Sequence, residues 1–309
     1  MIKIGIINID TSHPITFAEY LKKGKRARYT AIYNDGFRSE AEVEGFISKY
    51  GLERRCSSIE ELADCVDIGF VQGCNWDRHL SQAKLFLAGG KPVFIDKPIV
   101  GSLSDCLKLE ELVAGGAVVL GSSSVRYANE ITEFMSIPEE ERGKVLNIYG
   151  TAGVDEFNYA IHIVEAIDAL AGADALSTRF IGRGRLDGKV CETFFVTFDN
   201  GITAAYNTCH GLWQPFEVVV MTTKTVHQFG IDNKKLYGAL LDRICDYMET
   251  GANRLAPVSR LTHAVKIMLA GRLSRENGGR EVLLRNIPEN DPGFDGDKFE
   301  REYAAAAQT

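Results

Sequence analysis

The stretch VFIDKPIV, Val93 to Val100, is the part of the chain that best indicates the fold, because a charged Lys-Pro pair stands where an apolar strand should end. The ring of Pro98 removes a backbone donor and disfavours helical geometry at Lys97, so we expect the strand to stop there. Lys97 then projects from the carboxyl end of a strand, which is the edge where open parallel sheets bind ligands. A plain strand-ending turn with a solvated lysine is the alternative interpretation.

The first 121 residues alternate short apolar runs with amphipathic stretches. The apolar runs are residues 4–7, 29–33, 68–71, 92–95 and 117–120. Stretches with helical spacing separate them, for example at residues 39–50, 78–88 and 104–114. This alternation predicts a parallel sheet with helices on both faces.

Beyond Gly121 the pattern changes to longer strand-like runs. Residues 190–198 and 202–208 are joined by Asp199-Asn200-Gly201, which favours a hairpin because Asn-Gly suits a tight turn. Further elements are a second antiparallel pair at 216–222 and 225–229, and helices at 158–170, 237–250 and 258–274. The predicted class is α/β: a Rossmann-type doubly wound parallel sheet over residues 1–121, then an α+β domain with a mainly antiparallel open sheet over 122–309.

Charge and cysteine content limit the classes of partner. The formal net charge of -7 argues against a nucleic-acid interface, and no apolar window of ~18 residues offers a membrane span. The amino terminus enters an apolar run almost at once, so we expect no signal peptide. The 7 cysteines contain no C-x-x-C pair, which favours reduced thiols and a cytoplasmic location.

Several motifs resemble the Gfo/Idh/MocA family of glucose-fructose oxidoreductase, inositol dehydrogenase and the rhizopine-catabolism oxidoreductases. Asp96-Lys97-Pro98 matches the family's Glu-Lys-Pro motif, and Asn75 and His79 match the Asn and His after its fourth strand. Ser124-Val125-Arg126-Tyr127 and the helix bearing His162 add support over nearly the whole length. The resemblance implies an NAD(P)-dependent oxidoreductase for a sugar, cyclitol or related hydroxy compound, assembled as a homodimer or homotetramer.

The chain departs from the family at the turn that usually cradles a dinucleotide pyrophosphate. The positions that are normally glycine are Asn8, Asp10 and His13. Asp10 adds a negative charge there, although Asn and Asp tolerate the left-handed backbone that such a turn needs. The residues able to cap the helix that begins near Pro14 are Asp10, Thr11 and Ser12. A well-capped helix and altered ligand binding therefore both remain open.

Signals for cofactor choice are mixed. Asp35 after the second strand suits the ribose hydroxyls of NAD, whereas Arg38 nearby suits the extra phosphate of NADP, so NAD is slightly favoured. The residues expected to bind the dinucleotide are Asn8, Asp10, Thr11, Ser12, His13, Asp35, Asn75, His79, Asp96 and Lys97. No spacing enforces convergence of Asp10, His13 and His79, so no metal site is predicted.

A second departure affects the expected catalytic pair. The family places an Asp four residues before a His on one helix face, and this chain has Asn158 and His162. By the resemblance, His162 is the base that removes a hydroxyl proton, and Lys97 stabilises the developing alkoxide. Asn158 orients substrate but does not ionise. A histidine that only packs in a helix is the alternative for His162.

Other polar and aromatic residues suit a cleft for a polyhydroxylated ring. The expected substrate-binding residues are Arg126, Tyr127 and Tyr159, and His210 and Trp213 are further candidates. The rival function is a non-redox family member, either a ligand-binding or regulatory protein or a lyase or hydrolase, that has lost the dinucleotide turn. Asp10 and Asn158 favour that rival, whereas Lys97, Asn75 and His162 favour the oxidoreductase.

Overall fold

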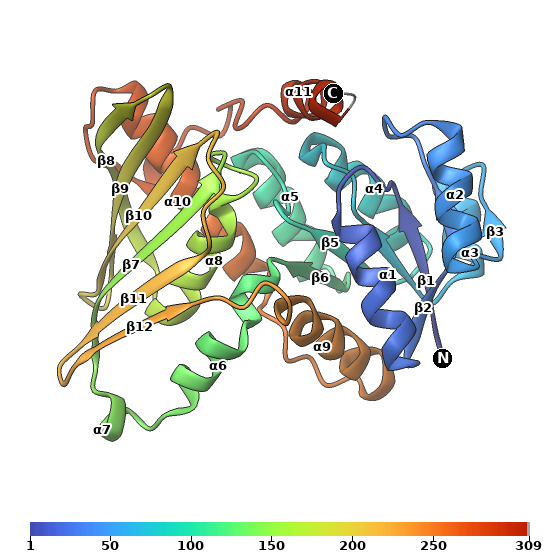
Figure 1. Ribbon diagram of the computed structural model, residues 1–309, viewed down its shortest axis with the longest axis horizontal. Coiled ribbons are helices and arrows are strands. Elements are labelled where there is room, and N and C mark those ends of the chain that lie inside the picture. The colour runs from blue at the N-terminus through green and yellow to red at the C-terminus, as the bar shows by residue number, and fades with distance from the viewer. Residues whose placement is uncertain (308–309) are drawn as a thin grey trace.

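The computed structural model describes residues 1–307, and its strands form two sheets with helices packed between and around them (Figure 1). The first sheet has the order β3-β2-β1-β4-β5-β6, and its pairs are parallel. Its strands are β1 (Ile2–Ile7), β2 (Ala27–Tyr33), β3 (Arg54–Arg55), β4 (Ile68–Val71), β5 (Val93–Asp96) and β6 (Val119–Ser122). The strand order reverses between β1 and β4, where doubly wound sheets bind ligands.

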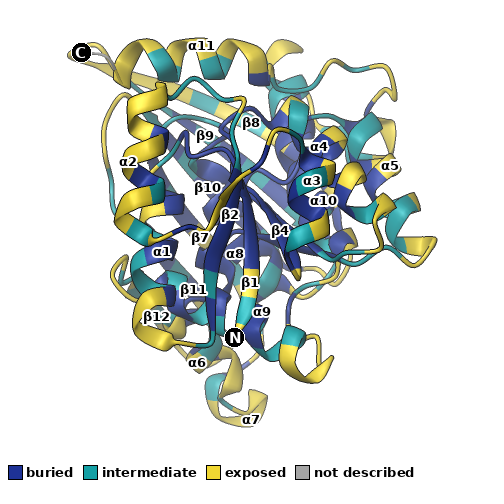
Figure 2. Ribbon diagram, turned by 90° about the vertical axis from the view of Figure 1, so that its right-hand side faces the viewer, coloured by how far each residue is buried: buried dark blue, intermediate teal, exposed yellow. Residues whose placement is uncertain are grey.

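Five helices accompany this sheet within the described residues: α1 (His13–Gly24), α2 (Glu40–Tyr50), α3 (Ile59–Cys65), α4 (Trp76–Ala88) and α5 (Leu103–Ala114). Local sequence signals set their ends. Ser39 and Glu42 form a capping box at the start of α2, and Gly51 ends it in the left-handed conformation. All residues of β4, β5 and β6 are buried, as expected for strands covered on both faces. Figure 2 shows β4 in the dark blue of buried residues. The predicted parallel doubly wound sheet is confirmed.

The second sheet has the order β12-β11-β7-β10-β9-β8-β13. Its strands are β7 (Val145–Val154), β8 (Ala175–Leu186), β9 (Lys189–Phe198), β10 (Thr203–His210), β11 (Glu217–Thr222), β12 (Val226–Gly230) and β13 (Val282–Leu283). The β7·β10 pair is parallel and the other pairs are antiparallel. The expected hairpin is confirmed, because β9 pairs with β10 and Gly201 has φ 84° in the turn.

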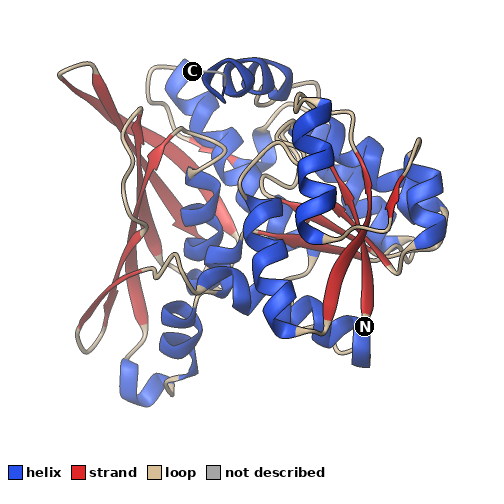
Figure 3. Ribbon diagram, turned by 45° about the vertical axis from the view of Figure 1, so that its right-hand side comes forward, coloured by secondary structure: helices blue, strands red, loops and turns tan. Residues whose placement is uncertain are grey.

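Helices cover one face of the second sheet and leave the other face open (Figure 3). The remaining helices are η1 (Ser124–Tyr127), α6 (Asn129–Ser136), α7 (Glu139–Arg142), α8 (Ala160–Ala171), α9 (Leu236–Thr250), α10 (Val258–Glu276), η2 (Leu284–Asn286) and α11 (Gly296–Ala307). α8 and α10 pack on the covered face, while Leu146, Leu176 and Ile181 are exposed. None of the helices within residues 1–307 combines the length and apolarity that crossing a bilayer requires.

Two late helices pack against the first half of the chain. The buried residues Leu240, Leu241 and Ile244 of α9 share an apolar cluster with Phe17 and Phe70. α11 contacts α4 and lies across the top of the molecule in Figure 1. The carboxyl ends of β1 and β4 therefore face residues from the end of the chain.

Candidate active site

Lys97 follows directly after β5, as the Lys-Pro pair predicts, and its side chain is buried. The ammonium donates to the side-chain Oδ1 of Asn158 at 2.7 Å and to the carbonyl oxygen of Asn158 at 3.1 Å. It also lies 5.5 Å from the ring centroid of Tyr159. Burial lowers the pKa of Lys97, while Asp96 and Asp155 oppose that shift. The structure thus brings Lys97 and Asn158 into direct contact.

His162 lies on α8 and is buried beside this pair. Its Nδ1 is 2.6 Å from the hydroxyl of Ser123, and its ring centroid is 5.1 Å from that of Phe216. Burial holds the pKa of His162 well below its usual value, and the nearby charges of Lys97 and His13 add to that effect. A neutral imidazole at physiological pH is the form that can accept a proton.

Asn158 precedes α8, because the helix begins at Ala160 rather than at residue 158 as expected. The pair at 158 and 162 therefore does not form one helical turn. The Asn158 Nδ2 instead donates to the side chain of Asp155 at 3.3 Å. Asp155 was not expected from sequence. Its carboxylate is the hydrogen-bond partner of Asn158 on the side away from Lys97.

A cavity of about 230 Å³ joins these groups between the two halves of the molecule. Thr11, Ser12, His13 and Lys97 line one side, and Asn158, Tyr159, His162, Trp213, Phe216 and Tyr237 line the other. This volume is smaller than the ~300–1,000 Å³ of sites for drug-sized ligands. It suits a small polar molecule, or one ring of a larger ligand.

The turn after β1 keeps a left-handed residue without glycine. Asn8 has φ 66°, and its Oδ1 accepts hydrogen bonds from the backbone N–H groups of Asp35 and Gly36. This bond pair joins the ends of β1 and β2. The Asn8 side-chain oxygen and the Asp35 backbone N–H are therefore already used in hydrogen bonds that stabilise the loop.

Helix α1 is not capped as the sequence suggested. Ser12 occupies the N-cap position without a side-chain capping bond, and Asp10 points elsewhere. Only Thr11 contributes, because its Oγ1 accepts from the backbone N–H of His13 at 3.2 Å. The first turn of α1 carries no acidic residue, so its dipole favours an anion at this end.

Asp10 is fully buried. One oxygen accepts from the N–H of Cys74 at 3.1 Å, and the other has no hydrogen-bond partner within the described chain. A Cβ on Gly36 would lie 2.1 Å from the carboxylate, so a larger residue at position 36 would force the buried Asp10 side chain to move. Burial raises the pKa of Asp10 to about 6. Asp10 thus fills space between the loops after β1, β2 and β4.

His13 takes the place of the third glycine and forms a wall of the cavity. Its Nδ1 lies 2.8 Å from the carboxylate of Asp96. Burial alone would raise the pKa of Asp96, but His13 and Lys97 hold it below its usual value. Asp96 therefore supports His13 and the backbone of Lys97.

The two family positions after β4 have different surroundings. Asn75 uses its Oδ1 to cap α4, while its Nδ2 donates to Asp297 at 2.7 Å and to Glu300 at 3.0 Å. His79 is fully buried, and both of its ring nitrogens lie 2.9 Å from backbone carbonyls, those of Gly73 and Pro98. We infer a structural position for His79, since it does not face the cavity.

Helix α11 packs against α4. Asp77 accepts from the N–H groups of Gly296 and Asp297, which caps α11. Phe299 packs against Trp76 with ring centroids 4.9 Å apart, and Tyr303 reaches the cavity.

One group of side chains has spacing that would suit a cation. Ligand atoms of Asp10, Cys74 and Glu300 all lie within 4.8 Å of one another. This set differs from the Asp10, His13 and His79 combination considered from sequence. Like-charge proximity of Glu300 also contributes to the raised pKa of Asp10, after burial.

Two of the three expected substrate-binding residues lie away from the cavity. Arg126 is paired with Asp168 at 2.8 Å, and the Tyr127 hydroxyl donates to the carbonyl of Gly121. Tyr159 lines the cavity, as does Trp213. His210 instead lies 3.4 Å from Glu192.

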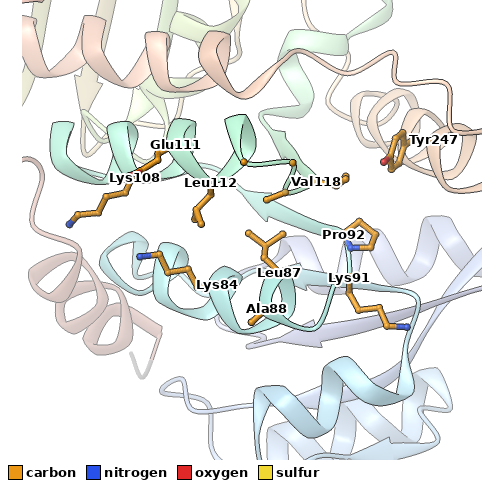
Figure 4. Close-up of a pocket in the computed structure, with 14 residues that line it drawn as sticks. Lys84, Leu87, Ala88, Lys91, Pro92, Lys108, Glu111, Leu112, Val118 and Tyr247 are labelled. Carbon is orange, nitrogen blue, oxygen red and sulfur yellow. The ribbon is translucent and has the colours of Figure 1, made fainter.

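A larger hollow of about 730 Å³ lies at the opposite edge of the first sheet (Figure 4). Lys91 and Pro92, just before β5, line it with Lys84 and Leu87 of α4. These residues stand at the amino end of β5, whereas Lys97 follows its carboxyl end. Open α/β sheets bind ligands at carboxyl ends, so the smaller cavity is the better candidate.

The fold is that of a two-domain protein of Rossmann type, and a candidate site lies in the cavity lined by both halves of the chain. Residues 2–123 match the sequence model of GFO_IDH_MocA, described as an oxidoreductase family with an NAD-binding Rossmann fold. Residues 2–123 are therefore similar to this oxidoreductase family, and they include the Asp96-Lys97-Pro98 motif that carried the resemblance. Nothing in the comparisons favours the non-redox alternative.

Solved structures share the fold over most of the chain. A probable dehydrogenase from Thermotoga maritima has a TM-score of 0.79 at 16% identity, covering 93% of this chain and 100% of that one. Scyllo-inositol dehydrogenase from Lactobacillus casei, with bound NAD(H) and scyllo-inositol, has a TM-score of 0.78 at 15% identity over 93% and 100%. GenD2 from gentamicin A biosynthesis, in complex with NAD, has 0.78 at 14% over 91% and 96%. A search of curated protein sequences gave no match.

Proposed function

We propose that the protein is an NAD(P)-dependent dehydrogenase that acts on a sugar, cyclitol or related hydroxy compound. The observation that carries this proposal is the convergence of Lys97, Asn158 and His162 on one cavity beside the carboxyl end of β5. The family of the amino-terminal domain and the inositol dehydrogenase among the similar structures support the substrate class.

In this proposal His162 accepts the hydroxyl proton of the substrate. Its depressed pKa keeps the imidazole neutral and ready to do so at physiological pH. The Lys97 ammonium stabilises the alkoxide that forms, and Asn158 fixes that ammonium through two hydrogen bonds. The nicotinamide, when bound, accepts the hydride. Tyr159 and Trp213 offer aromatic faces to the apolar side of a sugar ring.

The residues present fit a dinucleotide in part. The first turn of α1 suits its pyrophosphate, since that turn has neither an acidic residue nor a side-chain cap from Ser12. In this proposal Asp35 binds a ribose. Arg38 donates to the backbone carbonyl of Asp10, which supports NAD slightly over NADP. Asn75, however, is bonded to α11. We therefore infer that a dinucleotide reaches Asn75 only when α11 releases it.

The remaining proposals concern the setting of the enzyme. The open face of the second sheet exposes apolar side chains such as Leu146, Ile181 and Met221, which supports a homodimer or homotetramer through that face. All seven cysteines are free thiols in the described chain, in keeping with a cytoplasmic location. We propose neither a nucleic-acid nor a membrane partner, in accord with the acidic net charge.

Calorimetric titration with NAD, NADH, NADP and NADPH tests the proposal, after any bound nucleotide has been removed. Saturable binding of one pair is the expected result. The matched substrate test is turnover of the bound nucleotide with inositols and sugars, compared between the wild type and Lys97→Met. Absence of binding by all four nucleotides, in the wild type and in variants with weakened α11 contacts, would overturn the dehydrogenase assignment.

A further inference from the structure

We propose that Asp155 is a positioning residue that supplies, through Asn158, the carboxylate that this site lacks at position 158. The inference rests on the proposed function, in which Lys97 must stay charged beside the reacting hydroxyl. The usual acid of the pair is replaced by Asn158, which has no charge of its own.

A continuous chain of hydrogen bonds joins Asp155 to Lys97. The Asp155 carboxylate accepts from the Nδ2 of Asn158 at 3.3 Å, and the Oδ1 of Asn158 accepts from the Lys97 ammonium at 2.7 Å. An amide can donate at one end and accept at the other, so it orients both partners at once. The neutral Asn158 side chain thus links the Lys97 ammonium to the Asp155 carboxylate.

The backbone before Asp155 is shaped to place that carboxylate. Val154 has φ 69°, an unusual conformation for a β-branched residue. Two backbone bonds hold it there, from the Val154 N–H to Leu212 at 2.8 Å and from the Gly211 N–H to Val154 at 2.9 Å. The resulting turn lets Asp155 accept from the N–H of Tyr159, next to the start of α8. Such backbone strain is concentrated at functional sites.

Asp155 is also a counter-charge to Lys97, and no ion pair joins its carboxylate to another cation among residues 1–307. Asp96 faces Lys97 as well, but it is paired with His13. The titratable groups around the Lys97 ammonium are Asp96 on β5, Asp155 and Tyr159 before α8, Cys74 after β4, and His162 on α8. Without the Asp155 charge, the only carboxylate among these groups is that of Asp96, which is already paired with His13.

The test measures the pKa of Lys97 by NMR of protein labelled at the lysine side chains, with the signal assigned by Lys97→Met. Asp155→Asn should lower the Lys97 pKa by about one unit, because an opposite charge is removed nearby. Asn158→Asp should raise it. The exchanged double variant, Asp155→Asn with Asn158→Asp, should restore at least the wild-type value.

Asp155→Ser is the matched control for a purely structural role, since a serine hydroxyl can also accept from the N–H of Tyr159 but carries no charge. We expect it to lower the Lys97 pKa as Asp155→Asn does, at nearly unchanged thermal stability. An unchanged Lys97 pKa in both variants would overturn the inference and leave Asp155 as a residue that only fixes the turn before α8. This readout needs neither substrate nor cofactor, so its failure is distinct from failure of the proposed dehydrogenase activity.

Discussion

Helix α11 should compete with the dinucleotide for Asn75, and weakening its contacts should therefore raise nucleotide affinity. Asp297 and Glu300 each accept one hydrogen bond from the Asn75 amide, at 2.7 and 3.0 Å. Asp297 is exposed and Glu300 half-buried, so solvent reduces the value of each charged bond to roughly 0.5–1 kcal/mol. The double variant Asp297→Ala, Glu300→Ala should then weaken the binding of α11 to Asn75 by about 1–2 kcal/mol of free energy.

If the closed form predominates, apparent affinity rises by the same free energy, which is about 5- to 30-fold. Calorimetry with NAD and NADH on the full-length variants measures this directly. Glu302→Ala is the matched control, because it removes an exposed carboxylate of α11 whose ion-pair partner, Lys298, is on the same helix. Equal affinity in the wild type and the double variant would refute the competition, as would an equal gain in the control.

Three further predictions concern the residues around the cavity. Lys97→Met should lower kcat by ~10²–10³ and His162→Gln by ~10²–10⁴, because each removes stabilisation or proton transfer at the reacting oxygen; steady-state kinetics check this, and near wild-type kcat would contradict it. His162 should make the fold less stable in acid: its folded pKa lies below the unfolded value near 6.5, so the unfolded chain binds the extra proton first and stability falls as pH drops below that value. Denaturant unfolding from pH 7.5 to 5 should thus show a steeper loss in the wild type than in His162→Leu, and parallel curves would contradict the prediction. Ser123→Ala should alter the pH profile of kcat through His162 while leaving nucleotide affinity unchanged, since Ser123 contacts the Nδ1 and not the cofactor turn; a loss of nucleotide binding would contradict this assignment.

Much of the fold could be predicted because its strands carry strong local signals. The run ending at Asp96 is fully buried, and the Asn-Gly turn joins β9 to β10 as expected. β8 was not predicted as a separate strand, since its second half is polar and mostly exposed, and exposure removes the alternation that identifies strands. Likewise, β3 has only two residues, both exposed.

The site was predictable where one residue type defines a role, and less so where a fold contact does. Lys97 and His162 line one cavity together with Asn158, and their catalytic roles stay predictions from the resemblance. Asp155 gave no sequence signal, because its placement depends on the left-handed conformation of Val154. The position of α11 depends on aromatic packing of Phe299 more than 200 residues from its partner on α4, a separation that periodicity does not reveal.

The most direct test of the central claim is reduction of NAD by the full-length protein against a panel of inositols and sugars, with Lys97→Met measured in parallel. The account predicts nicotinamide reduction with at least one polyhydroxylated compound and its loss in Lys97→Met. No reduction with any compound, even in the Asp297→Ala, Glu300→Ala variant, would contradict it, as would activity that survives Lys97→Met.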